Sequence, residues 1–286
     1  MADHLTKSGI AVLVGRSNVG KSTLLNTLVG TKIAITTPKP QTTRNVIQGV
    51  LNEDRGQVVF ADTPGIFTRV PDLLTSKLNA KAKDSMEGID VLLYVVDATR
   101  HVGDEETAIH RLVKQADCPK ILVLNKSTLK RPFLDEFMAW KDDFDQVVDI
   151  DALEQKNIKE LKDAIFSHLK DGVLLYPLDQ ISNMSDSFRL AELIREKVFL
   201  GMHEEVPYSV TVEIDEAVVR PNGVLYVKAG ILTTSARYRK MLIGAGAHTV
   251  RGVSRAVRKE LEAVTGNKAY IELEVRVDEK WQERFE

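Results

Sequence analysis

Short apolar runs alternate with amphipathic stretches over the first 170 residues of the chain. The apolar runs are of strand length and almost uninterrupted, whereas the stretches between them carry apolar residues at helical spacing. We expect strands at residues 10–14, 57–61, 91–97, 121–124 and 147–150, and helices at residues 21–29, 73–85, 105–116, 133–140 and 158–169. Uniformly apolar strands that alternate with helices indicate a mostly parallel sheet with helices on both faces.

The pattern changes beyond residue 170. Residues 171–187 combine glycine and proline with clustered serine, asparagine and aspartate, which is typical of a connector, and Asp186 or Ser187 is a candidate cap for the next helix. After the connector we expect a helix at residues 188–199, strands at 208–215 and 224–232, helices at 235–242 and 248–264, and a closing strand at 269–277. The alternation along these strands predicts a small three-stranded sheet in an α+β domain.

The predicted division is therefore an α/β domain at residues 1–170, a linker at 171–187 and an α+β domain at 188–286, which suits a chain of this length. The chain has a single cysteine, Cys118, which cannot form an internal disulfide and lies where we expect a turn. A lone cysteine of this kind is typical of a protein from a reducing compartment. Residues 1–8 are polar, and the apolar runs are too short to cross a bilayer. We therefore expect a soluble, cytoplasmic protein.

The net charge of −2 conceals an uneven distribution. Residues 220–268 carry ten lysines and arginines but only two acids, Glu260 and Glu262, which gives this segment a charge of +8 and leaves −10 for the rest. A basic segment on an acidic chain is typical of a protein that binds nucleic acid or an anionic surface. The alternative is a solvated basic surface that has no such partner.

Candidate chemistry begins with a phosphate-binding loop. Residues 15–22 follow the pattern G-x-x-x-x-G-K-S between the first predicted strand and the first predicted helix, which is the context in which this pattern binds phosphate. Backbone N–H groups and the helix N-terminus would then face the phosphates. We expect Lys21 to reach the β- and γ-phosphates and Ser22 to bind Mg²⁺, the alternative being a glycine-rich turn without a ligand. The nucleotide-binding candidates here are Gly15, Arg16, Ser17, Asn18, Val19, Gly20, Lys21, Ser22 and Thr23.

A second motif follows the strand predicted at residues 57–61. Its aspartate can hold Mg²⁺ through the water shell, and its glycine amide can face a γ-phosphate. The motif comprises Asp62, Thr63, Pro64 and Gly65. Earlier in the chain, Thr42 or Thr43 can complete the Mg²⁺ shell, which would make residues 31–45 a switch segment. The alternative is that both threonines only begin the next strand.

The run from Gln41 to Arg44, taken together with residues 62–65, resembles the Era family of translation-factor-type GTPases. The resemblance implies an α/β P-loop NTPase domain that hydrolyses GTP with the help of Mg²⁺. It implies catalytic roles for Lys21, Thr42, Thr43 and Gly65. As in that family, an apolar residue, Ile66, follows the glycine in place of a glutamine that could orient water. Hydrolysis would then be slow, with electrostatic stabilisation of the transferring phosphoryl group and with water positioned by backbone, metal or a partner.

The motif that reads the base departs from the family pattern N-K-x-D. Asn125 and Lys126 are present, but Thr128 stands where the family has aspartate. Asp151 and Ala152 stand where the family usually has Ser-Ala. One hydroxyl cannot replace a carboxylate that accepts two N–H bonds, which should cost about 1.5–3 kcal/mol, or about 10- to 150-fold in affinity. We expect GTP as the ligand with weakened guanine selectivity, Asp151 as a candidate substitute acceptor, and tighter GTP binding after Thr128→Asp.

The predicted order of the second domain resembles the bacterial (type II) KH domain, and residues 280–285 resemble the Era C-terminus. KH domains clamp single-stranded RNA at a G-x-x-G turn between two helices. Here the fourth position of the turn is Ala247, and Ala245 stands at the usually basic variable position. The RNA-binding candidates are Arg237, Lys240, Ile243, Gly244, Ala245, Gly246, Ala247, Arg251, Arg255 and Arg258. The alternative is a degenerate KH fold retained for packing or for protein contacts.

Together these resemblances imply a GTP-dependent switch that binds small-subunit ribosomal RNA near its 3′ end and acts in assembly of the small ribosomal subunit. The ligands would be GTP or GDP with Mg²⁺. We expect a cytoplasmic monomer whose basic face permits peripheral contact with the inner face of the cell membrane. A second hypothesis is a non-hydrolysing RNA-binding assembly factor, for which the nucleotide is a structural ligand. A third is a nucleotidase or ATP-binding protein with relaxed base preference.

Overall fold

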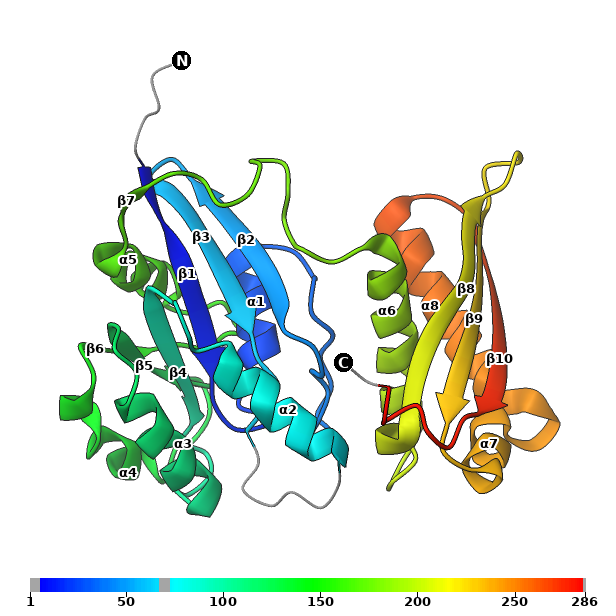
Figure 1. Cartoon of the computed structure of the whole chain (residues 1–286), viewed down its shortest axis with the longest axis horizontal. Coiled ribbons are helices and arrows are strands. Elements are labelled where there is room, and N and C mark those ends of the chain that lie inside the picture. Colours follow the sequence, from blue (N-terminus) through cyan, green and yellow to red (C-terminus); the bar gives the residue numbers. More distant parts are fainter. Residues whose placement is uncertain (1–5, 67–72, 285–286) are drawn as a thin grey trace. The chain divides into compact units, whose positions relative to one another are not determined.

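The structure is a computed structural model that describes residues 6–66 and 73–284. The chain divides into two compact units, an N-terminal unit that ends at Asn183 and a C-terminal unit that starts at Met184 (Figure 1). None of the helices in the described ranges is long and apolar enough to cross a membrane.

The N-terminal unit is built on one mixed sheet with the strand order β2-β3-β1-β4-β5-β6, and β7 pairs with the start of β1. The pairings among β3, β1, β4, β5 and β6 are parallel, whereas β2 and β7 are antiparallel to their neighbours. The elements are β1 (Thr6–Val14), α1 (Lys21–Val29), β2 (Ile47–Glu53), β3 (Gly56–Asp62), α2 (Leu73–Asp84), β4 (Val91–Asp97), α3 (Asp104–Lys114), β5 (Lys120–Asn125), α4 (Leu134–Met138), the 3-10 turn η1 (Lys141–Asp143), β6 (Gln146–Asp149), α5 (Ile158–His168) and β7 (Lys170–Gly172).

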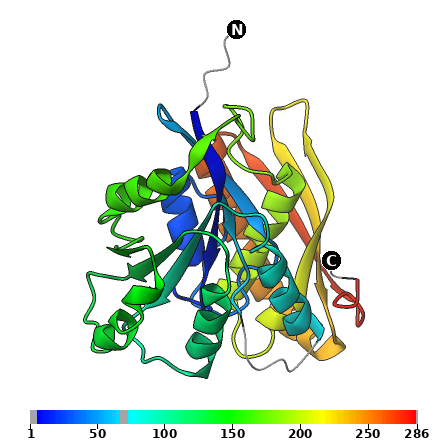
Figure 2. The same cartoon turned by 60° about the vertical axis from the view of Figure 1, so that its left-hand side comes forward.

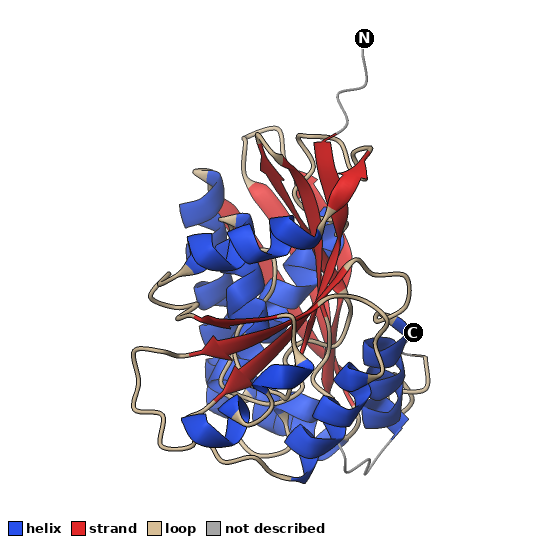
Figure 3. Cartoon of the chain, turned by 90° about the vertical axis from the view of Figure 1, so that its left-hand side faces the viewer, coloured by secondary structure: helices blue, strands red, loops and turns tan. Residues whose placement is uncertain are grey.

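Helices cover both faces of this sheet (Figures 2 and 3). One core cluster joins alternate residues of β1, β4 and β5 to Ala82 of α2, Ile109 of α3 and Phe137 of α4. On the other face, α1 and α5 bury Leu24, Leu28 and Leu161 among other residues. Every residue of β3 and β4 is buried, which agrees with the apolar runs at residues 58–61 and 91–96. The predicted α/β class is confirmed.

Two strands are absent from the predicted set, and both lack a strong apolar pattern. β2 lies at the edge of the sheet and mixes Gln48, Asn52 and Glu53 with apolar residues, so its alternation is weak. β7 is three residues long and has no buried position. Its pairing with β1 depends on a distant segment, and no local pattern can indicate that.

Residues 175–183 of the predicted linker contact β3 and the edge strand β2 of the N-terminal sheet. Gln57 is fully buried, and its side-chain oxygen accepts hydrogen bonds from the amides of Leu175 and Tyr176 at 2.8 and 2.9 Å. Further along, the Val50 amide donates to the Ile181 carbonyl at 2.9 Å. Ser182 forms an isolated bridge with Gly49. Residues 181–183 of the connector are therefore bound to the outer edge of β2.

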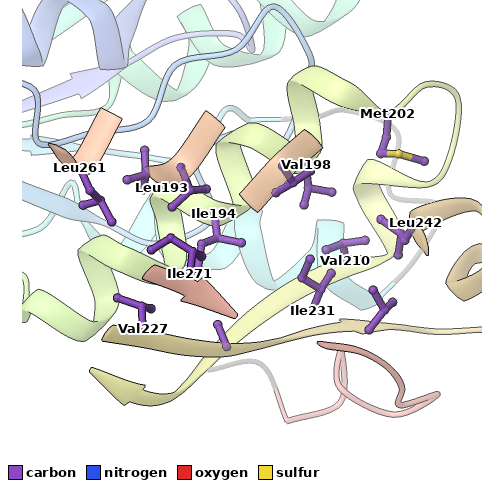
Figure 4. Packing of buried hydrophobic residues seen from close by; sticks show 14 of the residues in the cluster. Leu193, Ile194, Val198, Met202, Val210, Val227, Ile231, Leu242, Leu261 and Ile271 are labelled. Atoms are coloured by element: carbon purple, nitrogen blue, oxygen red, sulfur yellow. The ribbon is translucent and has the colours of Figure 1, made fainter. Parts of the chain in front are cut away.

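The C-terminal unit packs three helices on one three-stranded sheet of order β10-β9-β8, as expected. Strands β8 and β9 are antiparallel, and β10 lies parallel to β9 after the crossover through the helices. The elements are α6 (Asp186–Gly201), the 3-10 turn η2 (Pro207–Ser209), β8 (Val210–Val219), β9 (Leu225–Thr233), α7 (Ala236–Ile243), the 3-10 turn η3 (Ala245–Ala247), α8 (His248–Thr265) and β10 (Ala269–Val277). Figure 4 shows Leu193, Ile194 and Val198 of α6 packed toward the strands.

The capping residue of α6 differs from both predicted candidates. The Ser185 hydroxyl accepts a hydrogen bond from the Phe188 amide at 3.2 Å, so the helix begins at Asp186. Asp186 and Ser187 therefore occupy the first helical turn, where the negative charge of an aspartate interacts favourably with the positive end of the helix dipole.

After β10, Trp281 is buried and its Nε1 donates to the Ser209 carbonyl at 2.9 Å. Phe285 of the predicted tail lies outside the described residues.

Candidate nucleotide site and nucleic-acid interface

The phosphate-binding loop lies between the carboxyl end of β1 and the start of α1. Gly20 caps α1 with φ of 101°, and a Cβ added there would lie 2.3 Å from Nδ2 of Asn125, so only glycine fits this position. Lys21 is buried, and its Nζ donates to the carbonyls of Gly15 and Arg16 at 2.9 and 2.8 Å. The lysine is therefore folded back over its own loop, in position to meet an anion held by the loop amides.

Burial lowers the pKa of Lys21 to about 8, although the negative charges of Asp62 and Glu106 oppose this shift. Desolvation of the ammonium group therefore lowers this pKa by more than the two carboxylates raise it. A bound phosphate would add the negative charge that favours the protonated lysine.

Three oxygen ligands converge next to this lysine. The Ser22 hydroxyl donates to Oδ2 of Asp62 at 2.5 Å, and the Thr43 hydroxyl lies 2.8 Å from that of Ser22 and 3.3 Å from the same Oδ2. The other carboxylate oxygen, Oδ1 of Asp62, is buried and has no hydrogen-bond partner among the described residues. Burial raises the pKa of Asp62 despite these donors and Lys21. Hard oxygen ligands with one oxygen still to be satisfied fit Mg²⁺.

The two threonines of the predicted switch segment have different surroundings. The Thr42 hydroxyl lies 2.6 Å from the Thr37 hydroxyl and donates to the Lys39 carbonyl at 2.7 Å, within its own loop. Only Thr43 joins Ser22 and Asp62 in the contacts above. A cavity of about 60 Å³ lies between this segment, the phosphate-binding loop and Gly65, and its lining residues are Ser17, Asn18, Gly20, Lys21, Ser22, Thr23, Ile35, Thr36, Thr37, Gln41, Thr42, Thr43 and Gly65.

The motif at residues 62–65 is held close to the phosphate-binding loop. The buried Thr63 hydroxyl donates to the Leu13 carbonyl of β1 at 2.8 Å, and a Cβ on Gly65 would lie 2.9 Å from the Ser17 nitrogen. Pro64 is buried as well. Ile66 packs into the apolar cluster under the sheet and does not line the cavity. Its side chain therefore cannot orient a water in that cavity.

A buried acid below the loop was not predicted. Glu106 of α3 accepts a hydrogen bond from the Tyr94 hydroxyl at 2.6 Å, and Nε of Arg16 lies 3.6 Å from its Oε2 and 3.1 Å from Glu105. Burial raises the pKa of Glu106 even though Tyr94 and Arg16 favour its charge. The only sequence feature that pointed to this contact is the pair Glu105 and Glu106 in the first turn of a predicted helix. They fix the side chain of Arg16, which belongs to the phosphate-binding loop.

The base-reading residues also contact the phosphate-binding loop. Asn125 donates from Nδ2 to the Val19 carbonyl at 2.8 Å, and its Oδ1 accepts from the amides of Lys126 and Ala152 at 2.8 and 3.0 Å. It therefore joins the ends of β5 and β6 to the loop. The Thr27 hydroxyl of α1 adds a hydrogen bond to the Ala152 carbonyl at 2.8 Å.

Lys126 bridges the same loop to the end of β4. Its Nζ contacts Oδ2 of Asp97 at 2.5 Å and the Asn18 carbonyl at 3.2 Å. Although burial opposes the charge of Asp97, Lys126 and Thr99 hold the pKa of its carboxyl below the ordinary value. Asp97 was not among the predicted site residues. The only sequence feature that pointed to it is its position at the end of a buried strand.

Thr128 and Asp151 form a pair. The Thr128 hydroxyl donates to Oδ2 of Asp151 at 2.5 Å, and the Oδ1 atom of Asp151 accepts from the amides of Leu153 and Glu154 at 3.0 Å each. Although burial opposes its charge, these donors hold the pKa of Asp151 below the ordinary value. Thr128 itself is exposed. The predicted substitute acceptor is thus bonded to the residue that it was expected to replace.

The KH-like turn joins α7 to α8 with two successive left-handed residues. Gly246 has φ of 56°, and Ala247 has φ of 61° and ψ of 26° and caps α8 without a side-chain hydrogen bond. Ile243 packs against the core of the unit. The five predicted basic side chains are exposed: Arg237, Lys240, Arg251, Arg255 and Arg258. The first two lie on α7, and the last three lie on α8 at helical spacing.

Comparison with known proteins covers both units. Residues 10–126 match the family described as 50S ribosome-binding GTPase, and residues 205–282 match the KH domain family. GTPase Era of Trichlorobacter lovleyi is 38% identical over 289 residues, which span 99% of this chain and 97% of that protein. GTPase Era of Halothermothrix orenii is 36% identical over 283 residues, which span 97% and 95%.

Two solved structures are similar over almost the whole chain. A variant of Era from Aquifex aeolicus bound to GDP·AlF4⁻ is 34% identical, with a TM-score of 0.91 over 98% of this chain and 96% of the other. Era in complex with MgGDPNP and nucleotides 1506–1542 of 16S ribosomal RNA is also 34% identical, with a TM-score of 0.92 and the same coverage. These matches confirm the resemblance read from the motifs. The chain belongs to the Era family of GTPases.

Proposed function

We propose that this protein binds and hydrolyses GTP with Mg²⁺ and uses the nucleotide state to control RNA binding during assembly of the small ribosomal subunit. The observation that carries the nucleotide half is the convergence of Ser22, Thr43 and Asp62 beside Lys21. Lys21, Ser22 and Thr43 line the same cavity, and Asp62 accepts hydrogen bonds from both hydroxyls, so a cation and a phosphate can be held side by side there.

Each of these side chains has a distinct task in phosphoryl transfer. Lys21 leaves the loop carbonyls and binds the β- and γ-phosphate oxygens. Ser22, Asp62 and Thr43 would hold the magnesium ion, which would supply positive charge against the transferring phosphoryl group. The Gly65 amide donates to the γ-phosphate. Because no side chain at position 66 reaches the cavity, water is positioned by backbone groups or by a partner, and intrinsic hydrolysis is slow.

The switch follows from the position of Thr43. This threonine and Gly65 line the same cavity from two loops, so both can bind the γ-phosphate side of GTP, whereas GDP leaves them without that contact. The nucleotide then shifts the equilibrium between two arrangements of these loops by its differential affinity for them.

The RNA half of the proposal is supported by the basic face around the KH-like turn. Two exposed cations lie on α7, which leads into the turn, and three follow along α8, which leaves it. The turn itself has two left-handed residues, Gly246 and Ala247. The related Era structure was solved with nucleotides 1506–1542 of 16S ribosomal RNA, which points to small-subunit ribosomal RNA as the partner here. We extend the proposal to a cytoplasmic monomer, and to peripheral contact between the same basic face and anionic membrane at low salt.

Steady-state phosphate release, measured with and without small ribosomal subunits, tests the enzyme. We expect slow turnover that Lys21→Ala abolishes and that the exposed Lys159→Ala leaves unchanged. Turnover that is equal in the Lys21→Ala variant would rule out this site as its origin. No turnover by the folded, nucleotide-bound protein under either condition would favour the non-hydrolysing assembly factor instead.

RNA binding is tested by charge reversal at Arg251 or Arg255, with Lys159→Glu as the control of equal charge change in the N-terminal unit. We expect weaker binding to a small-subunit ribosomal RNA fragment and a smaller salt dependence for the two arginine variants only. An unchanged affinity at low salt would exclude this face as the RNA site.

A further inference from the structure

We propose that Asp151 determines the base preference of the nucleotide site by holding the hydrogen of the Thr128 hydroxyl, so that Thr128 offers only lone pairs to the base. The inference rests on the proposed function, because it requires a nucleoside beside the ends of β5 and β6. It assigns Asp151 a positioning role and leaves the contact with the base to Thr128.

The location of the base side follows from contacts with the phosphate-binding loop. Asn125 donates to the Val19 carbonyl, and Lys126 donates to the Asn18 carbonyl, so the end of β5 lies against the side of the loop. A nucleotide whose phosphates lie in the loop therefore extends its nucleoside toward residues 125–128. Thr128 is exposed at this place, whereas Asp151 is 4% exposed behind it.

The hydrogen bonds of Asp151 determine the direction of its bond with Thr128. Its Oδ1 accepts from the Leu153 and Glu154 amides, and its Oδ2 accepts from the Thr128 hydroxyl at 2.5 Å and from the Thr128 amide at 3.4 Å. Four donors around one carboxyl favour its charged form, which can only accept. The hydroxyl hydrogen of Thr128 therefore lies on the Asp151 side, and its lone pairs lie on the exposed side.

An acceptor at Thr128 favours a base that presents N–H groups on its Watson–Crick edge. At positions 1 and 2, guanine presents N1–H and a 2-amino group, and xanthine presents N1–H but a carbonyl. Adenine presents a lone pair at N1 and no polar group at position 2, because its amino group is at position 6. A single neutral acceptor should then favour guanine over adenine by roughly 2- to 10-fold, which is less than a carboxylate would give. If the hydroxyl were free to rotate, it could donate to adenine, and the preference would be lost.

The same geometry reverses the expected effect of Thr128→Asp. A carboxylate at position 128 would face the Asp151 carboxylate across the present hydrogen bond, and two such anions cannot both stay charged at this distance. Exchange of both residues avoids this. In Thr128→Asp/Asp151→Ser, a serine hydroxyl donates to a carboxylate that now stands nearer to the base.

Calorimetric titration of the full-length protein with GDP, XDP and ADP in Mg²⁺ tests the inference. We expect the GDP-to-ADP affinity ratio to fall toward one in both Thr128→Val and Asp151→Asn, of which the second retains an acceptor for the two amides. We expect Thr128→Asp to weaken GDP about tenfold, and Thr128→Asp/Asp151→Ser to bind GDP at least as tightly as the wild type. Lys159→Ala is the matched control, and thermal melting verifies that each variant is folded.

Distinct outcomes bear on the two proposals. A GDP-to-ADP ratio that stays unchanged in both Thr128→Val and Asp151→Asn would overturn the role of the pair, although nucleotide binding itself would stand. Tighter GDP binding by Thr128→Asp alone would overturn it as well, because the position would then tolerate a second carboxylate. Absence of binding for all three nucleotides to the folded wild type would refute the proposed function, and this inference with it.

Discussion

Replacement of Ala247 by glycine should stabilise the C-terminal unit, because this alanine holds a left-handed backbone at the start of α8. Its φ of 61° and ψ of 26° cost an L-residue about 1–2 kcal/mol relative to glycine. Glycine loses about 0.4–1 kcal/mol of that advantage through the greater freedom of the unfolded chain. It is also a better residue than alanine at a helix N-cap. The net expectation is an increase of about 0.5–1 kcal/mol in the free energy of unfolding.

Trp281 allows this change to be measured in the full-length chain, because it is buried in the same unit. Urea unfolding followed by its fluorescence, in a Trp140→Phe background, reports on that unit. The control is Ala245→Gly, two residues earlier in the turn, where the backbone is helical and the side chain exposed. That substitution should destabilise the unit by about 0.5–1 kcal/mol. If Ala247→Gly were no more stable than Ala245→Gly, the assigned backbone strain would be wrong.

Three further expectations concern buried polar groups of the N-terminal unit. Since burial lowers the folded-state pKa of Lys21 to about 8, the ligand-free protein should gain stability as pH rises from 8 to 10.5, and the advantage of Lys21→Met at pH 7 should shrink by about 3 kcal/mol over that range in urea titrations. Tyr94→Phe should cost about 1–3 kcal/mol by leaving a buried Glu106 oxygen without its donor, and clearly less in a Glu106→Met background, as a double-mutant cycle would measure. Gln57→Leu should speed proteolysis near residues 175–176, and cleavage at the wild-type rate would contradict its anchoring role.

The sequence patterns were sufficient for the parts of the molecule that depend on local composition. The phosphate-binding loop could be placed because its glycines, its lysine and the flanking strand and helix form one local pattern. The long helices and the buried strands could be predicted for the same reason. The edge strand β2 could not, since only three of its seven residues carry apolar side chains and its pairing with β3 supplies the missing stability.

The candidate site was harder to predict from the sequence where it depends on contacts between distant segments. Thr42 and Thr43 are adjacent and chemically equal, and only the loop geometry brings the second of them to Asp62. The bond between Thr128 and Asp151 joins residues 23 positions apart, and it arises because β5 and β6 are neighbours in the sheet. The departures from the family pattern at Thr128 and Asp151 therefore look independent in the sequence, although the two side chains are hydrogen-bonded to each other.

The connector along β2 also protects the sheet from unwanted association. An open sheet presents backbone donors at its edge, and a free edge can pair with another chain and start aggregation. The Gln48 and Val50 amides of β2 instead donate to Asn183 and to the Ile181 carbonyl. The segment that leads toward the C-terminal unit thus covers the edge that would otherwise recruit a foreign strand. Shortening it would therefore be expected to lower solubility before it affected nucleotide chemistry.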